Sequence, residues 1–143
     1  CKAAGASQVV NHRDNQFAAA VLEANKGIPL NRVIDVEFGA NLQTSISVCR
    51  VGGTIVTYSS AAIPNPEIPF YQMMYKDLVL RFVIVYAMPE SAKEAAIGDI
   101  QKALEKNLLQ HRIAESAPLN EIVKANELVE TGKIRGCVVL TIG

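Results

Sequence analysis

Short runs of apolar, often β-branched residues alternate along this chain with longer segments of helical periodicity. Runs that are almost continuously apolar are typical of parallel strands buried on both faces. We predict strands at residues 8–11, 32–37, 54–58, 78–85, 113–117 and 137–142. Because strands that alternate with helices build βαβ units, we expect an α/β fold whose first four strands form an open, doubly wound parallel sheet.

Helices are predicted between these strands. Asp14 is expected to cap the first, which Gly27 closes; others are expected at residues 41–49, 70–75 and 90–109, and from Asn120 to Gly132. Each helix is predicted to bury a set of apolar residues at helical spacing. The three main sets are Leu42, Ile46 and Cys49; Ala96, Ile100, Ala103, Leu104 and Leu108; and Ile122, Val123, Leu128 and Val129.

Composition excludes several classes of partner. The 14 basic and 14 acidic residues balance, and no basic stripe or polybasic cluster suggests nucleic acid or an anionic membrane. The longest apolar run, VIVYAM, is far too short to span a bilayer. Three scattered cysteines, Cys1, Cys49 and Cys137, fit no zinc or redox motif, so we expect buried structural thiols and a cytoplasmic location.

Ligands of open α/β sheets bind where the strands end. The segments that follow the first four predicted strands are residues 11–14, 37–41, 59–61 and 86–88, and in a parallel sheet they share one edge. They offer donors, acceptors and aromatic rings, which suit a nucleotide. Asp35 lies within an apolar strand, and a buried carboxylate there requires backbone or hydroxyl partners. The Gly52-Gly53 pair predicts a tight turn with positive φ.

The same sequence offers no catalytic side chain. It contains no nucleophile–base pair, no metal-ligand spacing, and no glycine-rich turn of the kind that holds a dinucleotide pyrophosphate. We therefore assign no catalytic residue and no metal ligand.

Three segments in this order resemble the C-terminal part of the medium-chain dehydrogenase/reductase superfamily. They are KAAGASQVVNHRD, GIPLNRVIDVEFGANLQTSISVCRVGGTIVTYSS and PLNEIVKANELVETGKIRGCVVLTI. The closest resemblance is to the zinc-independent NADPH:quinone oxidoreductase branch that includes zeta-crystallin. It covers nearly the whole chain and about the last two fifths of a family member, which implies a fragment without the catalytic domain and the glycine-rich turn.

The resemblance implies two parts and a set of cofactor-binding positions. Residues 1–109 correspond to a partial Rossmann domain, and residues 110–143 to a segment that returns to the catalytic domain, where its strands pair with strands absent here. The implied NADPH contacts are His12 at the adenosine end, Asn41, the segment Tyr58, Ser59, Ser60 and Ala61 beside the nicotinamide half, and Val83, Ile84 and Val85 at the carboxamide. Ser59 stands where the family has glycine.

The function implied by the resemblance is hydride transfer from NADPH to a quinone or an activated enone. The strand at 78–85 is expected to pair with its twin in a homodimer. Two alternatives stay open: a zinc-type alcohol dehydrogenase or enoyl reductase module, and a non-catalytic dimerisation or packing fragment. The isolated chain is expected to bind NADPH weakly or not at all.

Overall fold

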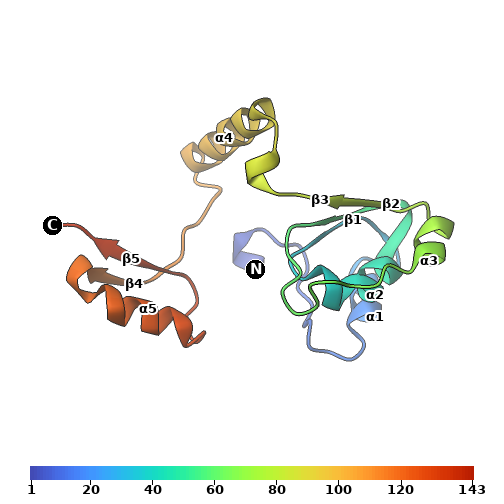
Figure 1. The fold of residues 1–143 in the computed structure, drawn as a ribbon, viewed down its shortest axis with the longest axis horizontal. Helices are drawn as coiled ribbons and strands as arrows, with labels where there is room; N and C mark the ends of the chain where they lie inside the picture. Colours follow the sequence, from blue (N-terminus) through green and yellow to red (C-terminus); the bar gives the residue numbers. More distant parts are fainter. The chain divides into compact units, whose positions relative to one another are not determined.

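The computed structural model describes residues 1–143, which fall into two compact units, Cys1–Ala96 and Ile97–Gly143 (Figure 1). The elements of the first unit are η1 (Lys2–Ala4), α1 (Phe17–Ala24), β1 (Leu30–Asp35), α2 (Phe38–Val48), β2 (Cys49–Thr57), α3 (Phe70–Tyr75), β3 (Val79–Phe82) and η2 (Val85–Ala87). Helix α4 (Glu90–Glu105) runs across the division. The second unit contains β4 (Ile113–Pro118), η3 (Leu119–Glu121), α5 (Ile122–Glu130) and β5 (Cys137–Thr141).

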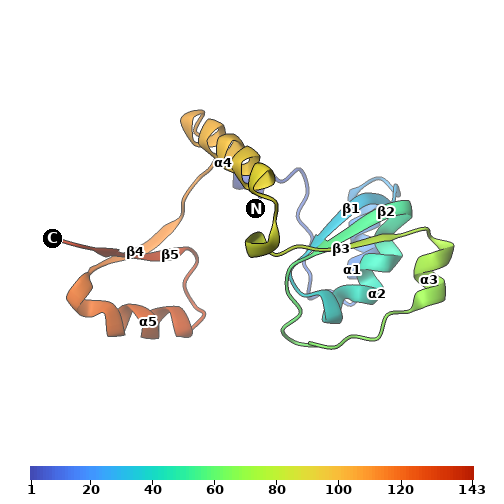
Figure 2. The same ribbon diagram turned by 45° about the horizontal axis from the view of Figure 1, so that its top comes forward.

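The first unit is built on a parallel sheet in the order β1-β2-β3. Helix α2 packs on one face of this sheet, and α1 packs against α2 (Figure 2). The predicted set Leu42, Ile46 and Cys49 is confirmed as buried, and it forms the core with Phe38, Ile55 and Met73. The opposite face of the sheet exposes Ile34, Val36 and Val79.

The second unit is a small βαβ unit. Strands β4 and β5 pair with each other in parallel, with α5 as the crossover between them. The expectation that these strands lack partners within the chain is therefore wrong. A two-stranded sheet covers only a narrow stripe of a helix, so Ala125 is the buried residue of α5 and Leu128 is half-buried. Of the predicted buried set, Ile122, Val123 and Val129 are exposed.

Two predictions near the N-terminus are wrong. Residues 8–11 form no strand, because their backbone pairs with no strand of either sheet, although Gln8 and Val10 line a hollow together with Leu30 of β1. Helix α1 begins at Phe17 rather than at Asp14, because Asp14 closes a turn instead: its Oδ1 accepts from Gln16 N at 2.8 Å and its backbone O accepts from Phe17 N. The C-terminal end is as predicted, with Gly27 at φ 77° and its N–H bonded to Leu22 O.

The predicted core stripe of α4 and the predicted burial of the thiols also need correction. Within α4, Ile100 and Leu104 are exposed and no residue is buried, because periodicity defines a face but burial needs an element that covers it. Among the cysteines only Cys49 is buried; Cys1 and Cys137 are exposed.

None of the helices combines the length and the apolar character that crossing a membrane requires.

Lys76 caps the C-terminal end of α2. Its Nζ donates to the backbone oxygens of Ile46 at 2.6 Å, Ser47 at 3.2 Å and Cys49 at 2.8 Å. The last carbonyls of a helix have no partner within it, and the negative end of the helix dipole attracts a cation. Gly52 has the predicted positive φ, 68°, and donates its N–H to Lys76 O, but the predicted tight turn at Gly52-Gly53 is wrong, because both glycines lie within β2 and Gly53 has no positive φ. Lys76 therefore ties the end of α2 and the start of β2 to the end of α3, three residues before β3 begins.

Asp35 fixes the other end of α2. It is 5% exposed at the last position of β1. Its Oδ1 accepts from Glu37 N and from Asn41 Nδ2, both at 2.9 Å, and its Oδ2 accepts from Ser45 Oγ at 3.1 Å. The expectation that this carboxylate has backbone and hydroxyl partners is confirmed. Because all three donors follow Asp35 in the β1–α2 segment, its carboxylate determines where α2 leaves the sheet.

Replacing Lys76 by Met tests the helix cap. Met keeps the length of the side chain but donates no hydrogen bond, so we expect the free energy of unfolding to fall by about 1–2 kcal/mol. The matched control is Lys2→Met at an exposed lysine, for which we expect less than about 0.5 kcal/mol. Urea unfolding followed by tyrosine fluorescence measures this change in the first unit, because all four tyrosines lie there. Equal stability of the two variants would show that the cap contributes nothing.

Replacing Asp35 by Ala tests the carboxylate that holds α2. The change removes three hydrogen bonds and leaves the buried Ser45 hydroxyl without its acceptor, so we expect a loss of about 2–4 kcal/mol in the same unfolding experiment. Glu67→Ala is the control, because Glu67 is an exposed carboxylate of the same unit that makes no hydrogen bond or ion pair. A loss of less than about 1 kcal/mol would contradict the role given to Asp35.

Candidate functional site

The segments that follow β1, β2 and β3 meet at one edge of the sheet. Phe38 N donates to Ser59 O at 3.0 Å and joins the first two segments. Val83 N donates to Thr57 O at 2.9 Å and joins the second to the third. The prediction of a shared edge is therefore confirmed for residues 37–41 and 59–61, whereas the residues that follow β3 at this edge are Val83 and Ile84 rather than the predicted 86–88, which lie in and after η2. It is wrong for residues 11–14, because they follow no strand.

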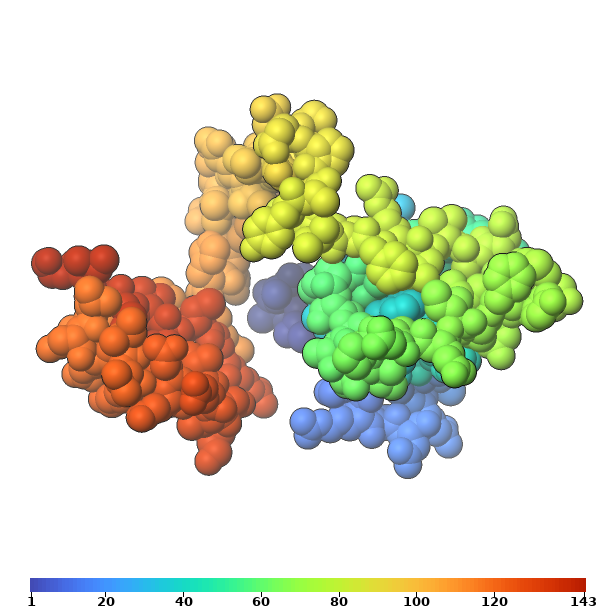
Figure 3. All heavy atoms as spheres, viewed as in Figure 1, coloured from blue at the N-terminus to red at the C-terminus, as the bar shows by residue number.

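A pocket of about 590 Å³ opens at this edge. In Figure 3 the cyan atoms at the start of α2 are visible between the green segment after β2 and the yellow-green end of β3. The lining is largely apolar: Phe38 and Phe82 meet edge to face at 5.7 Å between ring centroids. The remaining lining residues are Thr57, Tyr58, Ser59, Ser60, Pro64, Asn65, Pro66, Ile68, Val83 and Ile84.

The pocket brings together five of the predicted cofactor positions, namely Tyr58, Ser59, Ser60, Val83 and Ile84. Ala61 and Asn41 lie beside it with their donors already engaged: Ala61 N donates to a carboxylate oxygen of Glu37, and Asn41 Nδ2 to Asp35. Val85 begins η2 beyond the lining segment. His12 is exposed in the turn before α1 and does not line the pocket.

Sequence reasoning missed the aromatic and proline part of the lining. Phe38 is the first residue of α2, and Phe82 is the last residue of β3. Pro64, Pro66 and Ile68 come from the loop at residues 59–69, which is rich in proline and directly follows a core strand. The position of that loop after a core strand is the signal that would have included it in the site.

The chain's own residues form no metal site. No group of three or more His, Cys, Asp or Glu side chains lies close enough together to hold a metal ion. Zinc prefers a thiolate, and burial raises the pKa of the Cys49 thiol, an effect that the nearby Lys76 charge partly opposes. The residues present therefore do not fit a zinc ion, and no chemical step is derived through one.

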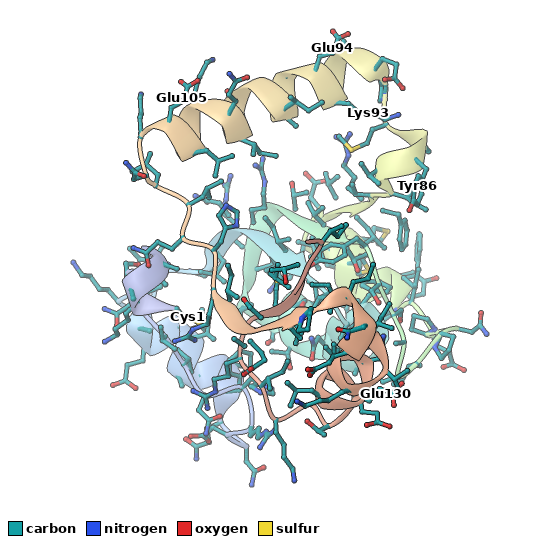
Figure 4. The ribbon with its side chains drawn as sticks, turned by 90° about the vertical axis from the view of Figure 1, so that its left-hand side faces the viewer. Cys1, Tyr86, Lys93, Glu94, Glu105 and Glu130 are labelled. Atoms are coloured by element: carbon teal, nitrogen blue, oxygen red, sulfur yellow. The ribbon has the colours of Figure 1, made fainter.

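Helix α4 carries charged side chains at the surface, away from the pocket. Glu94 and Glu105 project outward from α4, and Glu90 and Lys93 form a surface ion pair at 2.6 Å (Figure 4). Tyr86 in η2 is 86% exposed. None of these side chains contributes to the pocket.

Comparison with known proteins agrees with this architecture. A highly reducing polyketide synthase, ZEA2, of Gibberella zeae is 27% identical to the chain over 139 residues. This match covers 93% of the chain but 6% of the synthase. The chain thus spans a small part of this relative's length.

Solved structures match over nearly the whole chain. A mycobacterial quinone oxidoreductase is 22% identical, with a TM-score of 0.85 over 99% of this chain and 44% of its own. CurA of Vibrio vulnificus, solved in complex with NADPH, is 15% identical, with a TM-score of 0.73 over 97% of this chain and 44% of its own. At these identities the likeness shows the fold, the nucleotide-binding Rossmann-like part of such enzymes, and the chain spans under half of each structure.

The family itself is shown by a family model. The model described as zinc-binding dehydrogenase matches residues 4–140, nearly the whole chain. With the parallel α/β sheet and its carboxyl-edge pocket, this match establishes that the chain belongs to the zinc-binding dehydrogenase family, within the medium-chain dehydrogenase/reductase superfamily.

Proposed function

We propose that this chain forms the nicotinamide half of an NADPH site in an oxidoreductase that transfers hydride to a quinone or an activated enone. The observation that carries the proposal is the pocket at the carboxyl edge of the parallel sheet, where open α/β folds bind nucleotides. It is supported by the NADPH complex of CurA and by the quinone oxidoreductase among the matched structures.

The pocket has the properties that a flat, partly polar ring requires. Phe38 and Phe82 supply apolar walls, and the segment Val83–Ile84 supplies backbone groups next to them. Ser59 and Ser60 contribute hydroxyl groups on the opposite segment, although the Ser60 hydroxyl already donates to Ile63 O at 2.6 Å. A few polar groups in a mainly apolar concavity are typical of a cofactor site.

The contribution of the chain to the reaction is positioning. NADPH, when bound, supplies the hydride. Phe38, Phe82 and Ile84 are placed to exclude water from one side of the nicotinamide, which protects the hydride donor and lowers the local dielectric. The pocket contains no carboxylate, histidine or lysine, and the hydroxyl groups in its lining belong to Thr57, Tyr58, Ser59 and Ser60.

A zinc-type alcohol dehydrogenase is the second candidate. The match to the zinc-binding dehydrogenase family is the observation that favours it. An assay of alcohol oxidation with and without a chelator, next to NADPH-dependent reduction of quinones and enones, separates the two activities. If the protein reduces quinones or enones without zinc, we expect a chelator to leave this activity unchanged.

A tryptophan placed in the pocket tests the site. Ile84→Trp puts a large ring into the lining, and we expect it to weaken NADPH binding by the full-length protein at least about tenfold, measured by calorimetric titration. Ile97→Trp, an exposed position on α4, is the matched control and should bind as the wild type does. Equal affinities of the two variants would place the cofactor elsewhere.

We also propose that β3 pairs with a second copy of the chain. In the order β1-β2-β3 the outer edge of β3 has no strand partner, and Val79 and Phe82 on this strand are 54% and 66% exposed. An apolar strand with a free edge favours pairing with another strand.

A charge on the β3 edge strand tests this pairing. Val79→Lys adds a charge that opposes edge-to-edge association, so we expect it to convert a dimer into a monomer in analytical ultracentrifugation. Val9→Lys, at an exposed valine outside the strands, should leave the dimer intact. A wild-type protein that is monomeric at every concentration tested would contradict the pairing.

A further inference from the structure

The loop after β2 lies very close to the start of α2. Gly39 N donates to Ser60 Oγ at 2.9 Å. A Cβ atom built on Gly39 would lie 2.8 Å from Ser60 Oγ and 2.7 Å from Ile63 Cβ, and closer still to Ile63 O. Only glycine fits this position without displacing the loop, so residues 60–63 and the first turn of α2 form one tightly packed junction.

The carboxylate of Glu37 binds the same loop. Its Oε2 accepts from Ala61 N at 3.1 Å and its Oε1 accepts from Ala62 N at 3.0 Å. Two successive backbone N–H groups that face one carboxylate form a small anion-binding nest, here filled by a side chain of the protein. Glu37 is half-buried, and its own N–H is held by Asp35 at 2.9 Å, so its backbone is fixed to β1.

The loop that Glu37 holds is a wall of the pocket. Ser59 and Ser60 on one side of the two alanines line the pocket, and so does Pro64 on the other. The side chains of Ala61 and Ala62 are exposed, and these two residues are tied to the rest of the unit by the Glu37 carboxylate. Release of the two N–H groups would therefore free the wall between its two lining segments.

From these contacts we propose that Glu37 is a positioning residue for the nicotinamide pocket: its carboxylate clamps Ala61 and Ala62 and so sets the wall that the cofactor meets. The effect of the clamp on cofactor binding rests on the proposed function, whereas its effect on the position of the loop does not. Glu37 itself does not line the pocket, so it acts through the loop rather than through contact with the ligand.

The test uses the full-length protein with Glu37→Ala, Glu37→Gln and the control Glu67→Ala. Gln keeps the shape of Glu but has one oxygen acceptor instead of two, so it can retain only one of the two hydrogen bonds. Glu67 lies in the same loop, is exposed and makes no hydrogen bond or ion pair in the structure. Amide hydrogen exchange at residues 60–63 and the dissociation constant for NADPH are measured for each variant, with protection of the buried Ile55 amide as the check on folding.

We expect Glu37→Ala to raise exchange at Ala61 and Ala62 at least about tenfold and to weaken NADPH binding by a similar factor, because a hydrogen bond to a charged acceptor is worth that much or more. Glu37→Gln should fall between Glu37→Ala and the wild type in both measurements. Glu67→Ala should match the wild type in both, and Ile55 should stay protected throughout.

Unchanged exchange at Ala61 and Ala62 in Glu37→Ala would overturn the clamp. Raised exchange with unchanged NADPH affinity would overturn its role in positioning the cofactor. If the wild-type protein binds no NADPH, the proposed function fails, and the exchange measurement still decides whether Glu37 sets the position of the loop.

Discussion

The hydrogen bonds of the buried Asp35 carboxylate are the interaction on which the arrangement of this chain depends. A carboxylate with 5% exposure is costly unless it is well bonded, and here one backbone N–H, one amide and one hydroxyl bond it. All three donors belong to the segment that leads into α2 and to α2 itself. The requirement to satisfy one buried charge thereby fixes the direction in which the helix leaves the sheet.

The position of α2 in turn defines the pocket. With Asp35 holding Glu37 N, the Glu37 side chain reaches Ala61 and Ala62, and Phe38 N reaches Ser59 O. At the other end of the helix, Lys76 fixes the turn that leads to β3, whose last residue, Phe82, meets Phe38. Two charged side chains, one at each end of α2, therefore bring the ends of three strands to one cavity. These contacts, rather than any catalytic side chain, account for the formation of the pocket.

Local sequence patterns were sufficient to predict much of this fold. Apolar runs located β1, β2, β4 and β5, although Cys49–Thr57 is longer and Val79–Phe82 shorter than predicted. Glycines marked the ends of helices, and a carboxylate within a strand indicated a bonded buried charge. Features that depend on a partner element were not predictable: residues 8–11 have strand composition but pair with no strand, and the stripe of α4 has the right spacing but is exposed. The resemblance to a known family indicated Tyr58, Ser59, Ser60, Val83 and Ile84, whereas Phe38 and the prolines enter the lining through tertiary packing that no local pattern predicts.

The central claim is that the carboxyl edge of the three-stranded sheet receives the nicotinamide half of NADPH. The most direct measurement is a titration of isotope-labelled full-length protein with NADPH, followed by the chemical shifts of the backbone amides. The account predicts that the largest shift changes occur at Ser59, Ser60, Val83 and Ile84, with small changes in β4, α5 and β5. Saturable changes that are largest in β4, α5 or β5, or an absence of any change at the carboxyl edge, would contradict it.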